Sequence, residues 1–161
     1  MTELNDRLEA VLAPVLEVVR TIDPSEPDAR ATLDAKLPVG SPALEALRAV
    51  VREGVAAGWL ASRENAGIRF GRVRKAADAA DLSIDCVHMD QPGPGHTHPN
   101  GEIDLCFAVE GSPTFDGREP GWTVYPPGSW HVPTVAGGVM DILYFLPGGA
   151  IRFEPEPAVD G

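Results

Sequence analysis

The sequence is poor in cysteine, in histidine and in basic residues. It contains two Cys, four His and 13 Lys and Arg against 24 Asp and Glu, for a formal net charge of −11. Phosphate backbones and anionic membrane surfaces would repel such a chain, so we expect neither nucleic acid nor membrane as a partner. Cys86 and Cys106 are too few for a disulfide framework in 161 residues, and we expect reduced thiols.

Long apolar runs are also absent. None approaches the ~20 residues that a membrane-spanning helix requires. The first six residues are acidic and amphipathic and do not have the basic and apolar regions of a signal peptide. We therefore expect a soluble, cytoplasmic protein with one main core, which a chain of this length can bury.

The first 60 residues carry signals for three helices. Apolar residues between positions 4 and 19 recur at helical spacing, with Pro14 as a possible kink or break. The segment Ser25–Asp28 resembles a capping box and predicts a short second helix after it. A serine before Pro42 predicts the start of a third helix, for which Gly58 is the expected C-cap.

From Trp59 onward the chain changes to short β runs separated by Gly and Pro, which is typical of a sandwich or barrel. The predicted strands are residues 68–73, 82–89, 103–109, 123–125, 139–146 and 150–153. We predict a mainly β fold with a helical N-terminal extension at 1–60, a β-barrel at 61–154 and a flexible tail at 155–161.

Three of the four histidines fall into one pattern with a glutamate. His96 and His98 are two residues apart, so on an extended segment their imidazoles project to the same side. A turn at residues 99–101 can bring Glu102 back to that side, and His131 is the fourth candidate. Three imidazoles and a carboxylate form a ligand set for a divalent metal, leaving positions for water or substrate. Such sites accept Fe, Mn, Ni, Co or Zn, and the sequence does not select among them.

These residues resemble the two motifs of the cupin family. His-x-His, a glutamate and a hydrophobic strand ending in glycine match the first motif, and Gly121, Pro126, Gly128 and His131 match the second. The asparagine that usually follows the last histidine is replaced by Val135. The resemblance implies a small jelly-roll β-barrel around the metal site.

Strand alternation suggests which other side chains share the ligand face. If Glu102 points into the barrel, Asp104 and Cys106 should do so too, and the apolar residues between them should face outward. That apolar outer face must be covered by the N-terminal helices or by another subunit, so we predict a homodimer to which the helices contribute.

Basic and aromatic residues supply candidates for substrate binding. Among the arginines of residues 69–74, Arg72 is the first choice to face inward and Arg69 the alternative if the register is shifted by one. An inward arginine can hold a substrate carboxylate or pair with Asp104. The candidates for an aromatic pocket wall are Tyr125, Trp130 and Tyr144.

A narrower resemblance covers nearly the whole chain. The helical N-terminal third and the segments 95–104 and 125–134 together resemble the bacterial 4-hydroxylaminobenzoate lyase family. The resemblance implies conversion of 4-hydroxylaminobenzoate to 3,4-dihydroxybenzoate with release of ammonia, in nitroarene breakdown. The predicted catalytic residues are Glu102 and His96, with Glu102 as an acid–base group if it is not a tight metal ligand. The metal would act as a Lewis acid or lower the pKa of a water.

Two other functions suit the same four ligands. One is a non-haem iron dioxygenase acting on an aromatic or thiol substrate, and the other is a non-catalytic cupin that senses or stores a metal or ligand. Oxygen uptake with substrate would indicate the dioxygenase, whereas ammonia release without oxygen would indicate the lyase.

Overall fold

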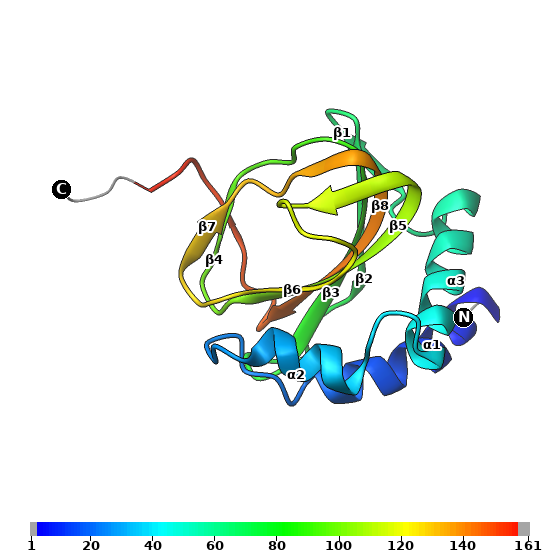
Figure 1. Ribbon diagram of the computed structural model, residues 1–161, viewed down its shortest axis with the longest axis horizontal. Coiled ribbons are helices and arrows are strands. Elements are labelled where there is room, and N and C mark those ends of the chain that lie inside the picture. Colours follow the sequence, from blue (N-terminus) through cyan, green and yellow to red (C-terminus); the bar gives the residue numbers. More distant parts are fainter. Residues whose placement is uncertain (1–2, 158–161) are drawn as a thin grey trace.

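Within residues 3–157, three helices precede nine strands (Figure 1). The computed structural model describes residues 3–157, with side chains from residue 6 onward. The helices are α1 (Glu3–Val19), α2 (Ala29–Lys36) and α3 (Pro42–Ala57). The strands are β1 (Arg63–Asn65), β2 (Ile68–Arg74), β3 (Leu82–Met89), β4 (His96–His98), β5 (Glu102–Phe115), β6 (Gly121–Tyr125), β7 (Ser129–His131), β8 (Val135–Pro147) and β9 (Arg152–Phe153). Residues 158–161 of the predicted tail lie outside the described residues.

The local signals at the helices are partly confirmed. Pro14 lies inside one continuous α1. α3 begins at Pro42 and ends before Gly58, whose φ of 84° is the left-handed cap that glycine adopts without a Cβ clash. The predicted capping box is wrong, because Asp28 is itself the N-cap of α2 and makes no side-chain cap bond. The hydroxyl of Ser25 donates instead to Asp23 at 2.7 Å, within the preceding turn.

The strands form two antiparallel sheets that enclose a common interior (Figure 1). The larger sheet has the order β1-β2-β3-β8-β5-β6, and the smaller has the order β7-β4-β9. The helices lie outside the strands, with α1 and α2 along the bottom in Figure 1 and α3 at one side. The mainly β barrel with helices at its N-terminal side is confirmed. Six strands were predicted, but the prediction for β5 ended six residues early and that for β8 began four residues late, and the three-residue strands β1, β4 and β7 were not delimited.

The two faces of β5 separate as alternation predicts. Ile103, Leu105 and Phe107 are buried against apolar residues of all three helices, including Leu12, Leu33 and Leu47. On the other face, Cys106 belongs to an apolar cluster inside the barrel. The helices of the same chain therefore cover the apolar outer face that motivated the homodimer prediction.

Both cysteines lie in the protein interior. Cys86 and Cys106 are free and buried. Burial raises the pKa of the Cys86 thiol to about 12, so the thiolate that most reagents attack is disfavoured. Within residues 3–157, no helix has the length and apolar character needed to cross a membrane.

Candidate metal centre and adjoining cleft

Three strands bring the four predicted ligands together. His96 and His98 project from the same face of β4, and His131 on β7 is the register partner of His96. The turn after β4 closes with the N–H of Gly101 donating to the carbonyl of His98 at 3.1 Å, and Gly101 has a φ of 87°. This turn brings Glu102, the first residue of β5, back toward the histidines.

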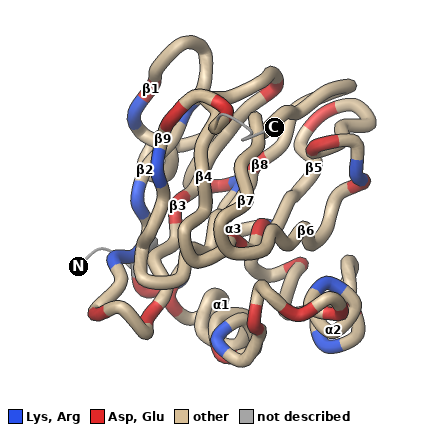
Figure 2. The backbone as a smooth tube through the Cα atoms, turned by 90° about the vertical axis from the view of Figure 1, so that its left-hand side faces the viewer, with Lys and Arg blue, Asp and Glu red and all other residues tan. Residues whose placement is uncertain are grey.

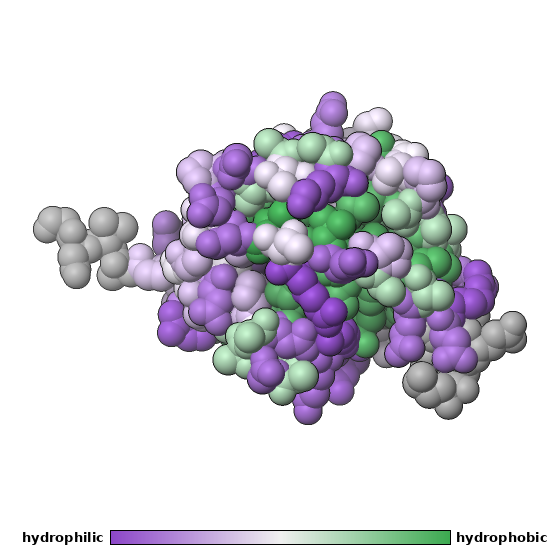
Figure 3. Space-filling view, turned by 90° about the horizontal axis from the view of Figure 1, so that it is seen from below, coloured by the Kyte–Doolittle hydropathy of each residue, from purple (hydrophilic) through white to green (hydrophobic). Residues whose placement is uncertain are grey.

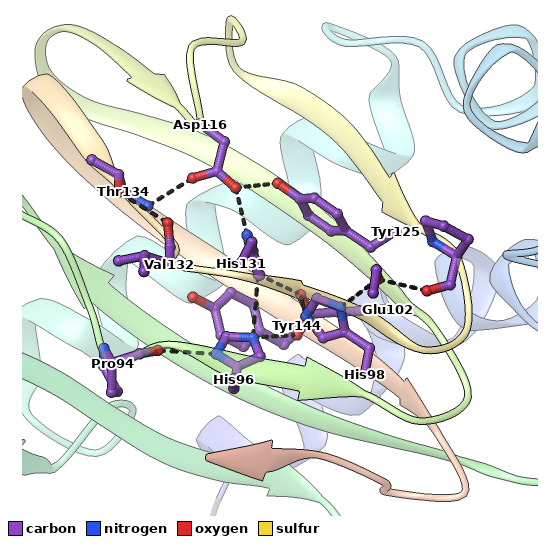
Figure 4. A network of polar contacts seen from close by, with 12 residues as sticks. Pro94, His96, His98, Glu102, Asp116, Tyr125, His131, Val132, Thr134 and Tyr144 are labelled. Atoms are coloured by element: carbon purple, nitrogen blue, oxygen red, sulfur yellow. Dashed lines mark hydrogen bonds and ion pairs between the residues drawn. The ribbon is translucent and has the colours of Figure 1, made fainter. Parts of the chain in front are cut away.

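The four functional ends converge on one point (Figure 4). Each histidine has its Nε2 close to a carboxylate oxygen of Glu102. The distance is 3.6 Å for His96, 3.0 Å for His98 and 3.6 Å for His131. The Nε2 atoms of His96 and His131 are 3.2 Å apart. A metal about 2.0–2.2 Å from each ligand atom separates neighbouring ligand atoms by about 2.8–3.6 Å at tetrahedral or octahedral angles. These four spacings match that range, and all the ligand atoms lie within 4.8 Å of one another.

Hydrogen bonds behind the rings assign the tautomer of each histidine. Nδ1 of His96 faces the carbonyl of Pro94 at 3.1 Å, and a carbonyl only accepts. Nδ1 of His98 faces the hydroxyl of Ser129 at 2.9 Å, and that hydroxyl already donates to the carbonyl of Pro126. Both rings therefore carry their proton on Nδ1 and present a bare Nε2 lone pair to the centre.

His131 follows the same logic through a carboxylate. Its Nδ1 lies 2.6 Å from Asp116, which also accepts from the N–H of Thr134 at 2.8 Å and from the hydroxyl of Tyr125 (Figure 4). Burial lowers the pKa of His131, but Asp116 and Glu102 raise it to about 8 overall. Asp116 thus fixes the ring and makes its Nε2 a stronger base.

The centre has the properties of a cation site. Nε2 of His98 and both carboxylate oxygens of Glu102 are buried and have no hydrogen-bond partner among the described residues. Burial raises the pKa of Glu102, but hydrogen bonds from the imidazoles of His131, His96 and His98, when these rings are protonated, lower it to well below its ordinary range. Three lone pairs and a carboxylate facing one another are stable only around a positive charge. The four side chains can therefore hold a metal ion.

Asp104 lies next to this centre without being part of it. It is fully buried on β5, and both its oxygens lack a hydrogen-bond partner among the described residues. Burial, and then the charge of Glu102, raise the pKa of Asp104 well above its ordinary range. The possible pairing of Arg72 with Asp104 is wrong, because Arg72 pairs with Asp85 at 2.7 Å.

A cleft of about 1010 Å³ leads from the metal centre to the surface. Its inner part includes His96, Tyr144 and Met89, and its outer part includes the cations Arg63, Arg72 and Lys75. Figure 2 shows Lys and Arg gathered along β1, β2 and β9. A second cavity of about 250 Å³, between α3 and the β5–β6 edge, contains none of the four candidate ligands. The larger cleft is therefore the one through which a substrate can reach the site.

Two of the five predicted substrate residues, Arg72 and Tyr144, line this cleft. The other three do not line it. Arg69 points to the opposite face of β2 and donates to the carbonyls of Val55 and Ala61, at the C-terminal side of α3. Tyr125 lies against His131 with ring centroids 4.2 Å apart, and the Trp130 Nε1 donates to the carbonyl of Glu154 at 2.9 Å.

Sequence reasoning missed Asp116 and Phe153. Asp116 occupies a tight turn after β5, where the Asp-Gly pair indicates a turn and nothing indicates a contact with His131. Phe153 was included in a strand, but its position beside His96 depends on pairing between β9 and β4. Both contacts join segments distant in sequence.

Comparison with known proteins identifies the family. The family model described as PnbB, 4-hydroxylaminobenzoate lyase, matches residues 12–153. The chain belongs to the 4-hydroxylaminobenzoate lyase family. A lyase of that name from Nocardioides sp. (strain LMS-CY) is 33% identical over 132 residues, which cover 75% of this chain and 78% of the relative. Another from Pseudomonas putida is 32% identical over 124 residues, covering 65% and 70%.

Solved structures also resemble this family member. One is an RmlC-like cupin protein from Ralstonia eutropha, which is 12% identical with a TM-score of 0.41, over 54% of this chain and 60% of that one. The cupin fold is supported instead by the two-sheet barrel and by the constellation of His96, His98, Glu102 and His131. Both features agree with the expected cupin fold.

Proposed function

We propose that this member of the family converts 4-hydroxylaminobenzoate and water to 3,4-dihydroxybenzoate and ammonia. The reaction is balanced with these four species and has no net redox change, so it requires no electron acceptor. Support comes from the family match and from two relatives that carry the name of this lyase. The cleft that reaches the four candidate ligands is the structural observation that favours this reaction.

The cleft suits an aromatic acid in both of its parts. Its inner walls are apolar and aromatic and reach His96, which suits a benzene ring carrying a reactive group toward the centre. Its charged lining consists of Arg63, Arg72 and Lys75 against the single acid Asp85. This local excess of cations offsets the net charge of −11 and offers a partner to a carboxylate.

Arg72 remains our first candidate for the carboxylate clamp. It lies on the same face of β2 as Phe70, and its side chain is 45% exposed beside Asp85. A guanidinium can contact a substrate carboxylate with two parallel N–H bonds while it keeps one bond to Asp85. Lys75 and Arg63 have no ion-pair partner among the described residues and add to the positive charge.

The residues at the centre have separate tasks. A divalent metal bound by His96, His98, Glu102 and His131 would supply Lewis acidity toward an oxygen of the substrate or of water. Glu102 is fully buried and carries a carboxylate, which favours a ligand role over that of a free acid–base group. Asp116 orients His131, and the apolar walls of the cleft exclude bulk water from the reacting ring.

The helical face also suggests how the protein assembles. The lower face, along which α1 and α2 lie, carries a patch of hydrophobic residues bordered by hydrophilic ones (Figure 3). We propose a homodimer in which this helical face takes part, although the chain already covers the outer face of β5 itself. Light scattering at micromolar concentration tests this, and a monomer would contradict it.

The reaction is tested by anaerobic incubation of metal-loaded protein with 4-hydroxylaminobenzoate. We expect equal amounts of ammonia and 3,4-dihydroxybenzoate, without oxygen. Stoichiometric oxygen consumption and no ammonia would instead indicate a dioxygenase. Tight binding of the substrate without turnover would indicate a sensor or storage protein.

A further inference from the structure

Phe153 is an exposed aromatic residue that lines the cleft beside His96. The residue is 66% exposed, and it is one of three exposed large apolar residues among those the structure describes, with Val39 and Val132. Only Phe153 of these three lines the cleft that reaches the metal centre. An exposed phenyl ring contributes little to folding, and its place in this cleft leaves the ring open to contact with a ligand.

The register of β9 aims this ring at the site. Phe153 is the direct partner of His96 in the antiparallel pair of β9 and β4. Directly opposed residues of such a pair project to the same face of the sheet, so Phe153 shares the face of the metal-binding imidazole. The two ring centroids are 5.6 Å apart, in an edge-to-face arrangement.

The residue after Phe153 fastens β9 from the other face of the sheet. The carboxylate of Glu154 accepts from the hydroxyl of Thr97 at 2.5 Å, and its carbonyl accepts from the indole of Trp130 at 2.9 Å. Its N–H donates to the carbonyl of Gly95 at 3.3 Å. A strand of two residues would fray without such bonds, so these contacts hold the phenyl ring in place before a ligand arrives.

We infer that Phe153 is the residue against which the benzene ring of the substrate stacks beside His96. This inference rests on the proposed function and adds the determinant of its preference for aromatic acids. Ring stacking positions the substituent para to the carboxylate toward the metal centre, while the carboxylate faces the cations of the outer cleft. Phe153 is thus a positioning and specificity residue and takes no part in proton transfer.

Kinetics of Phe153 variants test the inference. Phe153→Ala should raise KM about tenfold and leave metal content unchanged, because a stacked aromatic pair and its buried area are lost. Phe153→Tyr should stay near the wild-type value, and Phe153→Leu should lie between the two. Val39→Ala, a truncation of a similarly exposed apolar residue outside this cleft, serves as the control.

Binding of simple acids separates this inference from the proposed reaction. Benzoate and cyclohexanecarboxylate share the carboxylate and differ in the ring, so calorimetry with both measures the preference for an aromatic ring. The wild type should prefer benzoate about fivefold or more, and Phe153→Ala should lose most of that preference. An unchanged preference and an unchanged KM would overturn the role of Phe153 even if ammonia is released. If the wild type releases no ammonia but prefers benzoate, and Phe153→Ala loses that preference, only the lyase reaction is refuted.

Discussion

Replacing Asp116 by Asn tests how the chain prepares its metal ligands. Asp116 has a φ of 51°, and asparagine tolerates this left-handed conformation better than other replacements. The substitution therefore removes the charge and one acceptor oxygen without straining the turn. Asn can keep the bond from the Thr134 N–H, but its amide nitrogen cannot accept the proton that Nδ1 of His131 now donates.

The size of the effect follows from the bonds that are lost. The Asp116 carboxylate holds His131 through a charge-assisted bond of 2.6 Å and also accepts from Tyr125. Loss of such a carboxylate behind a ligating histidine costs about 10- to 100-fold in metal affinity, or about 1.4–2.7 kcal/mol. Tyr125→Phe is the matched control, since it removes one bond to Asp116 but keeps the ring that packs 4.2 Å from His131. It should weaken metal binding much less.

The assay is competition for Zn²⁺ or Mn²⁺ against a chromophoric chelator at fixed pH. Thermal unfolding of the metal-free proteins should show that Asp116→Asn keeps its fold. A metal affinity within twofold of the wild type would refute the view that Asp116 orients His131 for the centre. An equal loss in Tyr125→Phe would assign the effect to the hydroxyl network instead.

Three further predictions concern the cleft, the thiols and the core. Arg72→Ala should raise KM about 10- to 100-fold and Arg72→Lys should restore part of it, because a charge-assisted bidentate contact is worth roughly 1.5–3 kcal/mol. If Arg72 only neutralises Asp85, the melting temperature will fall and KM will not change. Cys86 and Cys106 should resist a thiol-specific reagent in the native protein and react fully in guanidinium, whereas rapid native labelling would contradict their burial. Leu105→Ala, at the contact between β5 and the helices, should lower the free energy of unfolding by about 2–5 kcal/mol in denaturant titration, and a loss under 1 kcal/mol would contradict that packing.

The grouping of His96, His98 and Glu102 could be predicted from the sequence because its geometry is local, whereas His131 was proposed from the second motif and reaches them by pairing of β7 with β4. His96 and His98 share a face through strand alternation, and the turn that ends at Gly101 returns the chain to Glu102. The apolar residues of β5 were assigned outward by the same alternation, and they do pack against the helices. In each case, a period of two or a turn residue carries the information.

The remaining features depend on contacts between distant segments. Asp116 meets His131 only because the turn after β5 folds over β7, and no local pattern records that. Likewise, the choice between Asp85 and Asp104 as the partner of Arg72 depends on the pairing of β2 with β3. The capping-box prediction failed because Asp23 competes for the hydroxyl of Ser25.

The most direct test of the account measures metal content and anaerobic ammonia release together in the histidine variants. Single replacements of His96, His98 and His131 by Ala should each lose both properties while the far-ultraviolet circular dichroism of the barrel is kept. His88→Gln is the matched control, because His88 lies away from the centre and pairs with Asp141 at 2.7 Å. This variant should retain one metal per chain and full turnover. Full metal occupancy in all three alanine variants, or ammonia release from metal-free protein, would contradict the central claim.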